Sequence, residues 1–307
     1  MERIVVVGSS NTDMIIKMQR IPKPGETIIG GDFSMAAGGK GANQAVAAAR
    51  SGGQVTFIAR VGNDLFGEQA IKGFAADGIN VDGVIKDANA PSGVALIFVG
   101  SDGENSIAVA SGANAKLSVT DIEEIERSQK VISSAGVLLI QLETPIETVK
   151  AAVQLAASGT RVILNPAPAQ PLNDGILRHV SILTPNESEA ELLTGVAIEN
   201  EAGAATAATA LIARGVETVL ITLGSQGTYV AGQDFCGIVP GFSVTPVDTT
   251  AAGDVFNGTL AVALAEKKPL REAVRFANAA AAISVTKLGA QPSAPYRPEI
   301  ESFLSTS

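Results

Sequence analysis

The sequence predicts an α/β fold with a Rossmann-like, mostly parallel sheet, helices on both faces and a small β-sheet lid. Short strand-like runs alternate with alanine-rich helical runs, which is typical of βαβ units. Two further segments interrupt this alternation with strands and no crossover helix. Of the 307 residues, 46% are hydrophobic and 17% are charged, and no Pro/Ser-rich linker divides the chain. We therefore expect a single α/β domain over residues 1–307.

The expected strands are short and rich in Val, Ile and Leu, whereas the expected helices are rich in Ala and end close to Gly. Strands are predicted at 3–8, 55–62, 136–143, 161–168 and 217–224. Helices are predicted at 41–52, 67–78 and 145–159, and residues 181–195 indicate a strand followed by a helix. Ligands of such folds bind beyond the carboxyl ends of the strands.

Polar side chains and one glycine follow several of these strands. They are Asn11, Asp13, Glu143, Asn165, Asn186, Glu189 and Gly224. Because the carboxyl ends of parallel strands meet at one edge of the sheet, we expect these residues to gather there.

The lid is predicted from residues 12–35 and 92–110, which indicate antiparallel strands with a DG turn at 102 and 103. In VALIFV, Ala95 and Ile97 point to one face and Leu96 and Phe98 to the other, so both faces are apolar. One face could cover a substrate and the other a second copy of the chain, which predicts a homodimer. In the alternative, the sheet packs only on its own domain.

Composition excludes several classes of function. Lys and Arg total 22 against 31 for Asp and Glu, and no basic cluster is visible, so no nucleic-acid partner is expected. No apolar run approaches a membrane span or a signal peptide, which predicts a cytoplasmic protein. The chain has one cysteine, Cys236, and one histidine, His179, so any general base is expected to be a carboxylate. The first strand is followed by no GxGxxG, which argues against a nicotinamide oxidoreductase.

A first glycine-rich corner lies at residues 36–52. Glycines 38, 39 and 41 permit close approach to a ligand, and Lys40 and Asn43 follow near the start of a helix. Asn43 can both donate and accept, so it could hold neighbouring hydroxyls of a sugar, with Asp13 and Glu143 as further acceptors. Taken alone, the corner is equally well a turn with a solvated Lys and an Asn cap.

A second corner, DTTAAGDVFNG, spans residues 248–258. If a helix begins near Gly253, the free N–H groups from Ala251 to Asp254 form a site for a phosphate at the positive end of the helix dipole. Phe256, Leu260 and Leu264 would bury one stripe of that helix.

Asp254 would lie beside this anion site, where it could take a proton from an attacking hydroxyl. Alternatively, it is a first-turn helix acid that the dipole stabilises. The dipole is expected to lower the pKa of Asp254, which would weaken it as a base.

The two corners resemble the two signatures of the ribokinase-like sugar kinase family, also called the phosphofructokinase-B family. The resemblance continues in QLETP, LNPAPA, TPNESEAELLTG and KLGAQPSAP, and it spans essentially the whole chain. It implies ATP-dependent phosphorylation of D-ribose at the 5-hydroxyl, and a dimer formed through paired lids. The chain has Ala251 where the wider family commonly has glycine.

The resemblance also implies roles for individual residues. The sugar pocket would consist of Asn11, Asp13, Gly39, Lys40, Asn43 and Glu143, with Asp254 as the base and Ala251, Ala252 and Gly253 in the anion hole. The ATP site would consist of Asn186, Glu189, Thr222, Leu223, Gly224, Ser225, Gln226, Gly227, Gly253 and Asn278.

Two metal ions follow from the same resemblance. Glu189 would order Mg²⁺ through water, although it could also be an ordinary exposed acid in the first turn of a helix. A K⁺ site would consist of Asp248, Thr250, Ser284, Lys287, Gly289 and Ser293.

Other functions remain open at this point. A kinase of the same family for deoxyribose, fructose or a nucleoside differs only in its acceptor. A non-catalytic sugar-binding protein on the same fold is a different class, which the retained Asp254 disfavours.

Overall fold

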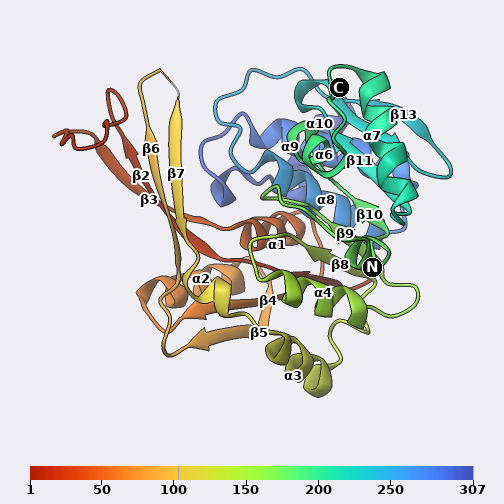
Figure 1. Cartoon of the computed structure of the whole chain (residues 1–307), viewed down its shortest axis with the longest axis horizontal. Coiled ribbons are helices and arrows are strands. Elements are labelled where there is room, and N and C mark those ends of the chain that lie inside the picture. Colours follow the sequence, from red (N-terminus) through yellow and green to blue (C-terminus); the bar gives the residue numbers. More distant parts are fainter. Residues whose placement is uncertain (103, 307) are drawn as a thin grey trace.

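The computed structural model describes residues 1–102 and 104–306, and it has the predicted α/β architecture (Figure 1). Nine strands form the central sheet in the order β13-β12-β11-β10-β9-β8-β1-β4-β5. Their bounds are Ile4–Val7 (β1), Val55–Gly62 (β4), Asn80–Asp87 (β5), Val137–Ile140 (β8), Arg161–Leu164 (β9), Ile182–Leu183 (β10), Thr218–Thr222 (β11), Gly227–Ala231 (β12) and Cys236–Pro240 (β13).

The strands from β11 to β5 run parallel, which confirms the prediction of a mostly parallel sheet. At the other edge, β12 and β13 pair antiparallel. The sequence pattern predicted no strands there, because Gly224 and Gly227 interrupt the apolar run and no helix follows.

Helices cover both faces of this sheet and form two separate apolar cores. Along β1, Ile4 and Val6 point into one core, and Val5 and Val7 point into the other. The first core contains α1 (Lys40–Arg50), α2 (Leu65–Ala76), α8 (Ala252–Ala265), α9 (Leu270–Ser284) and α10 (Arg297–Thr306). The second contains α3 (Val119–Gln129), α4 (Ile146–Leu155), α5 (Asp174–Leu177), α6 (Glu187–Thr194) and α7 (Glu201–Ala213).

Helix α8 is more deeply buried than its sequence indicated. The pattern predicted one apolar stripe, but every residue from Asp254 to Ala265 is buried. The reason is that α8 packs against α1 and α9 as well as against β1 and β8 of the sheet. Across the described residues, no helix combines the length and hydrophobicity that crossing a membrane requires.

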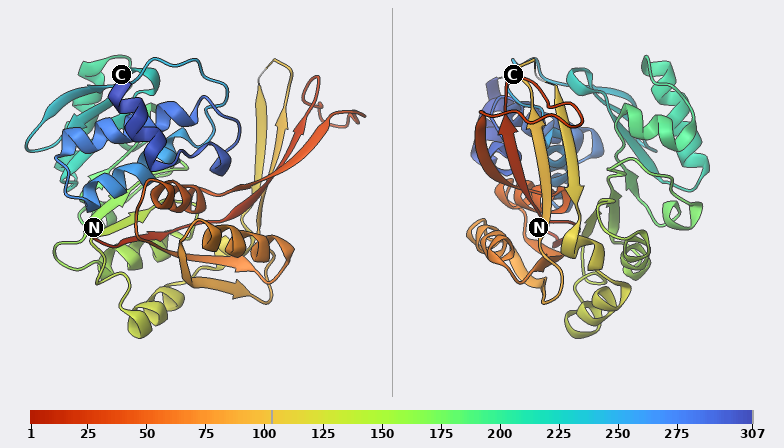
Figure 2. Two further views of the ribbon diagram at one scale, coloured as in Figure 1. Left: turned by 180° about the vertical axis from the view of Figure 1, so that it is seen from behind. Right: turned by 60° about the vertical axis from the view of Figure 1, so that its left-hand side comes forward.

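The small sheet stands away from the central sheet in Figures 1 and 2. It has the strand order β3-β2-β6-β7, with β2 parallel to β6 and antiparallel pairs on either side. The bounds are Asn11–Lys17 (β2), Asp32–Gly38 (β3), Gly93–Val99 (β6) and Asn105–Ala110 (β7). These strands confirm the small sheet predicted from 12–35 and 92–110. The predicted DG turn includes Gly103, which lies outside the described residues.

Both faces of the small sheet are apolar, as predicted. One face exposes Phe33, Met35 and Leu96, which are paired in register with Ile16 and Met14 of β2. The other face carries Ala95, Ile97, Ile107 and Val109, together with Asp13 near its base. The face with Asp13 turns toward the carboxyl ends of the central strands.

Candidate active site

The Asp254 carboxylate lies where the N-terminal ends of α1 and α8 meet. Its side chain is buried, with 5% of the residue exposed. Oδ2 accepts a hydrogen bond from Asn43 Nδ2 and Oδ1 accepts one from Gln44 Nε2, both at 2.9 Å. The two glycine-rich corners of the sequence therefore meet at one carboxylate.

Helix α1 begins at a corner that requires glycine. Gly39 has φ 89°, and a Cβ atom there would lie 2.7 Å from Asn11 N. This close approach places the start of α1 against the start of β2. Glu143, which follows β8, accepts from Lys40 N at 3.0 Å and from Ser9 Oγ at 2.5 Å. Asn11 and Glu143, which were predicted from the strand ends, therefore lie together with Gly39 and Lys40 of the first glycine-rich corner.

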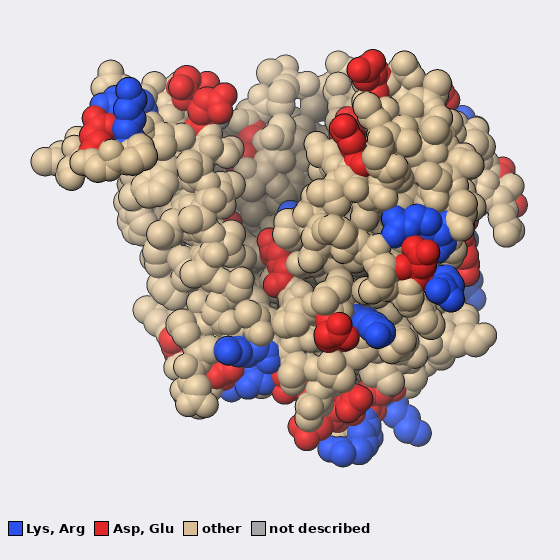
Figure 3. All heavy atoms as spheres, in the orientation of Figure 1, with Lys and Arg blue, Asp and Glu red and all other residues tan. Residues whose placement is uncertain are grey.

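Four carboxylates and one ammonium group interact around this corner. Burial, and after it the negative charges of Glu143 and Asp254, together raise the pKa of Asp13 to about 6. Burial lowers the pKa of Lys40, but the charges of Asp254, Glu143 and Glu189 outweigh burial, so the pKa is raised. Lys40 therefore remains a cation between the acids. Figure 3 shows the hollow beside the small sheet, with acidic side chains on its walls.

The expectation that the helix dipole lowers the pKa of Asp254 is wrong in direction. Burial raises this pKa, and it outweighs Lys40, Asn43 and Gln44, which lower it. Because a carboxylate with a raised pKa binds a proton more strongly, Asp254 is a better base than the sequence indicated.

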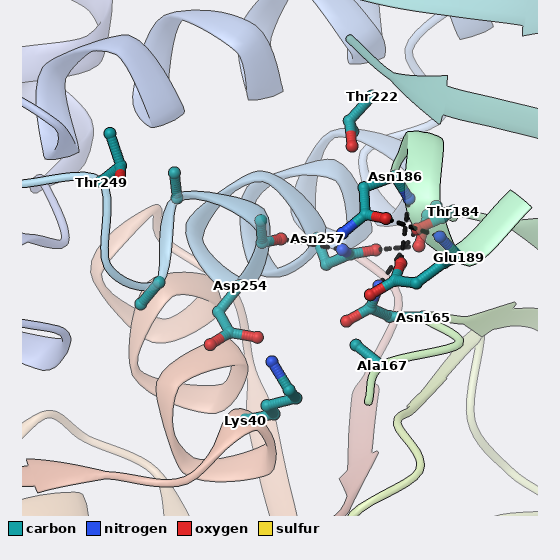
Figure 4. Close-up of a pocket in the computed structure, with 13 residues that line it drawn as sticks. Lys40, Asn165, Ala167, Thr184, Asn186, Glu189, Thr222, Thr249, Asp254 and Asn257 are labelled. Carbon is teal, nitrogen blue, oxygen red and sulfur yellow. Dashed lines mark hydrogen bonds between the residues drawn. The ribbon is translucent and has the colours of Figure 1, made fainter. Parts of the chain in front are cut away.

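A cavity of about 170 Å³ opens in front of Asp254 (Figure 4). Lys40 and Asp254 lie on one side of it, and Asn186 and Glu189 lie on the other. Its wall also includes residues Ala251, Ala252 and Gly253, Asn165, Ala167, Thr184, Thr222, Thr249 and Asn257.

One of the four backbone N–H groups that were predicted to bind an anion at the start of α8 is already hydrogen-bonded. Ala252 N donates to Thr249 O at 3.3 Å, so this amide is already engaged. Among the described residues, no acceptor lies within hydrogen-bonding distance of the N–H groups of Ala251, Gly253 and Asp254. Three of the four predicted donors therefore remain available to an anion.

Ala251 precedes α8 in the left-handed region, with φ 60°. This conformation costs a residue with a Cβ atom about 1–2 kcal/mol, which explains why glycine suits the position. We expect Ala251→Gly to raise the free energy of unfolding by about 1 kcal/mol, as measured by urea denaturation. The matched variant Ala252→Gly lies in the first turn of the helix and is expected to lower it by about 0.5 kcal/mol. If both variants raised the free energy of unfolding, or both lowered it, this explanation of Ala251 would be wrong.

A second cavity, of about 330 Å³, adjoins the first and shares Thr249 and Ala252 with it. Its wall is mostly apolar and includes Val244, Ala281 and Val285. Asn278 also lines it, but its side chain is already engaged: Oδ1 accepts from Thr228 Oγ1, and Nδ2 donates to Val239 O and Pro240 O. Asn278 therefore supports the wall of this cavity and keeps no free N–H.

The predicted ATP residues divide between the two cavities. Asn186, Glu189, Thr222 and Gly253 line the first. Gly224, Ser225, Gly227 and Asn278 line the second, whereas Leu223 is buried in the core and Gln226 lines neither.

Glu189 is buried, with 7% of the residue exposed, so it is not an ordinary exposed helix acid. It forms a capping box in which Asn186 N donates to Glu189 Oε2 at 2.9 Å and Glu189 N donates to Asn186 Oδ1 at 2.8 Å. Burial raises the pKa of Glu189 despite the Asn186 N–H and Lys40, which lower it. Among the described residues, the other carboxylate oxygen of Glu189 accepts no hydrogen bond, and the residue lines the cavity.

Of the six residues predicted for K⁺, two precede α8 (Asp248 and Thr250), one ends α9 (Ser284) and three follow α9 (Lys287, Gly289 and Ser293). Asp248 accepts from Thr250 N at 2.9 Å and from Gly289 N at 2.8 Å. Ser284 O accepts from Lys287 N, Ser293 Oγ donates to Ala290 O, and Lys287 Nζ pairs with Glu299. Within residues 1–102 and 104–306, no three Asp, Glu, His or Cys side chains form a metal-binding group.

Several polar residues of the site were not predicted from the sequence. Gln44, Gln141 and Asn257 are almost fully buried and belong to its hydrogen-bond network. Asn114 donates from Nδ2 to Asn11 Oδ1 at 2.8 Å and accepts from Ser10 N at 2.9 Å. Gln44 and Gln141 could have been found from the sequence, because each is a polar residue within an otherwise apolar run.

A parallel α/β sheet, a helix N-terminus with free amides and a buried carboxylate beside them define a phosphoryl-transfer class of enzyme. The model of the pfkB family carbohydrate kinases matches residues 1–297, and the chain belongs to this family.

The similar proteins include ribokinases. The chain is 47% identical to a ribokinase of Haemophilus influenzae over 302 residues, which cover 98% of each chain. Its structure resembles a ribokinase of Thermotoga maritima with a TM-score of 0.90 and 41% identity, covering 99% and 100% of the two chains. It also resembles an Arabidopsis thaliana ribokinase complexed with ribose and ATP, with a TM-score of 0.87 and 36% identity, covering 100% and 99%.

Proposed function

We propose that the protein is an ATP-dependent ribokinase that transfers the γ-phosphoryl group to the 5-hydroxyl of D-ribose. The observation that carries the proposal is the position of Asp254. Its buried carboxylate forms part of the wall of a cavity that the free amides of α8 also line, and a second cavity of about 330 Å³ adjoins it. A base, an anion site and room for a nucleotide thus lie side by side.

The sugar is proposed to bind between α1 and the base of the small sheet. Asn43 Oδ1 is buried and has no hydrogen-bond partner among the described residues, so it can accept from a sugar hydroxyl. Asn43 Nδ2 already donates to Asp254, which places the same hydroxyl close to the base. Asp13 and Glu143 supply further acceptors, and Asn11 completes the pocket.

In the proposed reaction, Asp254 accepts the proton of the 5-hydroxyl as the hydroxyl oxygen bonds to the γ-phosphorus of ATP. The bond from the γ-phosphorus to the bridging oxygen breaks, and ADP leaves. The N–H groups of Ala251, Gly253 and Asp254 donate to the phosphoryl oxygens on which negative charge develops. Lys40 contributes positive charge from the same side of the cavity as Asp254 (Figure 4). Movement of the small sheet toward the cavities, as a lid, would exclude water and suppress ATP hydrolysis.

The chain also has residues that could hold the two proposed metal ions. The free oxygen of Glu189 can hold a water of hydrated Mg²⁺, which dehydrates reluctantly. Asp248 and the backbone carbonyls near Ser284, Gly289 and Ser293 suit a weakly bound K⁺. These ions, when bound, would neutralise phosphate charge and polarise the anion site.

The exposed apolar face with Phe33, Met35 and Leu96 is proposed to pair with the same face of a second copy. This pairing forms a homodimer through the lid sheets. We propose that this activity is cytoplasmic.

The function is tested by measuring ADP release with ribose, Mg-ATP and K⁺. We expect turnover that depends on ribose, whereas no turnover would reject the proposal and favour a sugar-binding protein. Deoxyribose, fructose and nucleosides are compared by kcat/KM, because a missing hydroxyl leaves buried polar groups without a partner. A higher kcat/KM for one of these acceptors would reassign the substrate within the family.

The titration of Asp13 predicts a pH dependence of sugar binding. Its pKa of about 6 means that the carboxylate becomes protonated as the pH falls through 6 and loses an acceptor for sugar hydroxyls. We expect the KM for ribose to be roughly tenfold higher at pH 5 than at pH 7, as the linkage relation requires. In Asp13→Asn, the KM should be higher at pH 7 and nearly independent of pH. An equal pH dependence in both proteins would remove Asp13 from the sugar site.

A further inference from the structure

A chain of buried amides leads to the Asp254 carboxylate from the side away from the cavity. Gln141 Nε2, at the end of β8, donates to Gln44 Oε1 at 2.5 Å. Gln44 Nε2 donates to Asp254 Oδ1 at 2.9 Å and to Asn165 Oδ1 at 3.1 Å. Gln44 is 0% exposed and Gln141 is 1% exposed. Gln44 and Gln141 do not line the cavity in front of Asp254.

The direction of each hydrogen bond in this chain is determined by the carboxylate. An ionised carboxylate only accepts, so Gln44 must present its amide nitrogen to Asp254. The oxygen of Gln44 then faces Gln141, which must present its nitrogen in turn. Both hydrogens of Gln44 Nε2 are engaged, so the side chain is held at three points.

This order leaves one buried acceptor without a partner. Gln141 Oε1 has no hydrogen-bond partner among the described residues. Turning the amide of Gln141 over would place two oxygens against each other, 2.5 Å apart. Because an unpaired buried polar atom is costly, its presence indicates that the orientation of Gln44 is determined by what it does for Asp254.

We infer that Gln44 is a positioning residue that holds Asp254 in its ionised, reactive orientation, and that Gln141 keeps Gln44 in place. The inference rests on the proposed function, since it concerns the base of the same reaction. Gln44 fixes Oδ1 from behind, while Asn43 binds Oδ2 from the side of the sugar pocket. The two neighbouring residues of α1 thus have different roles, since Asn43 contacts the substrate and Gln44 orients the base.

The hydrogen bond from Gln44 also favours the charged form of Asp254. It lowers the pKa of this carboxyl and opposes the effect of burial, which is the larger of the two. Removing the amide should therefore raise the pKa of Asp254 further. The fraction of ionised base then falls at a given pH, and the acid limb of the kcat profile moves to higher pH.

The test uses Gln44→Met in the full chain, because Met has a similar length and no amide. At saturating ribose and Mg-ATP, we expect kcat to fall about 10- to 100-fold, which does not exceed the lower end of the roughly 10²- to 10⁴-fold that general-base catalysis contributes, because Asp254 itself remains. The KM for ribose should change less than about threefold, and the acid limb of the kcat–pH profile should move up by at least half a pH unit. Gln141→Met should produce a smaller change of the same sign.

The control is Thr259→Val, which removes a different buried hydrogen bond, between Thr259 of α8 and Ser51, the residue that follows α1. Ser51 Oγ and Thr259 Oγ1 lie 2.9 Å apart at the far end of the contact between α1 and α8. This variant should lose stability but keep the position of the acid limb. A kcat close to that of the wild type in Gln44→Met, or an unmoved acid limb, would overturn the inference, as would an equal shift in Thr259→Val.

The same experiment also covers two other outcomes, a Gln44→Met variant that does not fold and a wild-type protein that is inactive. If Gln44→Met does not fold, Gln141→Met is decisive, since it removes the hydrogen bond that holds Gln44 in place and leaves Gln44 itself unchanged. An unmoved acid limb in that variant rejects the inference. Wild-type protein without ribose-dependent turnover rejects the proposed function itself, whereas an active wild type with an insensitive Gln44→Met rejects only the role of Gln44.

Discussion

Asp254→Asn is expected to lower kcat by about 10³-fold while ribose still binds, because the variant keeps the shape of the side chain and loses the base. The substitution replaces one carboxylate oxygen, which accepts hydrogen bonds, with an amide nitrogen, which donates them. Asn43 Oδ1 has no hydrogen-bond partner among the described residues, so the amide of Asn43 can turn over and accept from this nitrogen, and the buried site remains paired. That turn uses the acceptor that we assign to the sugar, and the affinity for ribose should therefore fall moderately.

The measurement combines ADP release at saturating substrates with calorimetric titration of ribose. The matched control is Asp174→Asn, which changes an exposed acid in the first turn of α5. If Asp254 were only a helix-stabilising acid, the two variants would behave alike. A kcat near that of the wild type in Asp254→Asn would remove this residue from its proposed role.

Gly258→Ala is expected to destabilise the protein by about 3 kcal/mol, at the upper end of the usual cost of overpacking. A Cβ atom at Gly258 would lie 2.4 Å from Gln44 O and 2.8 Å from Ala48 N, and both are backbone atoms that side-chain rotation cannot move. Helices α1 and α8 would have to separate. Because Gln44 is part of the contact, kcat should fall as well.

Gly73→Ala is the matched control for this substitution. Gly73 lies within α2, and apart from its chain neighbours and the nearby backbone of that helix, no atom of the described residues lies within 4 Å of the position that its Cβ would occupy. Alanine there is expected to raise the free energy of unfolding by about 0.5–1 kcal/mol. Urea denaturation measures both variants. Similar free energies of unfolding for the two would show that the close approach of α1 and α8 does not depend on glycine.

Much of the site could be predicted because it follows from local patterns. The strand ends at Asn11, Glu143 and Asn186 were visible as polar residues after apolar runs, and parallel strands bring such ends together. The corner at Gly39 was visible as a glycine-rich stretch before a helix. The meeting of Asn43 with Asp254, 211 positions apart, rested on the resemblance of the two corners to family signatures.

Other properties depend on what surrounds a residue rather than on its neighbours in the chain. The pKa of Asp254 was expected to fall because a helix begins there, but burial by α1 and the sheet raises it. Asn278 was assigned to the nucleotide site and it lines the second cavity, but its amide group is also hydrogen-bonded to β12 and β13. No local pattern shows that an amide predicted to face a ligand is bonded to other strands.

The sequence by itself determined the alternation of strands and helices, the two glycine corners and the identity of the acid beside the second. Hydrophobic periodicity and backbone conformation are short-range properties, so they are visible in a single chain segment. Only the tertiary structure decided which groups face that acid, how far its proton affinity is raised, and that Gln44 and Gln141 support it. Desolvation and hydrogen-bond direction arise from packing between distant segments, and they exist only once α1, α8 and β8 have come together.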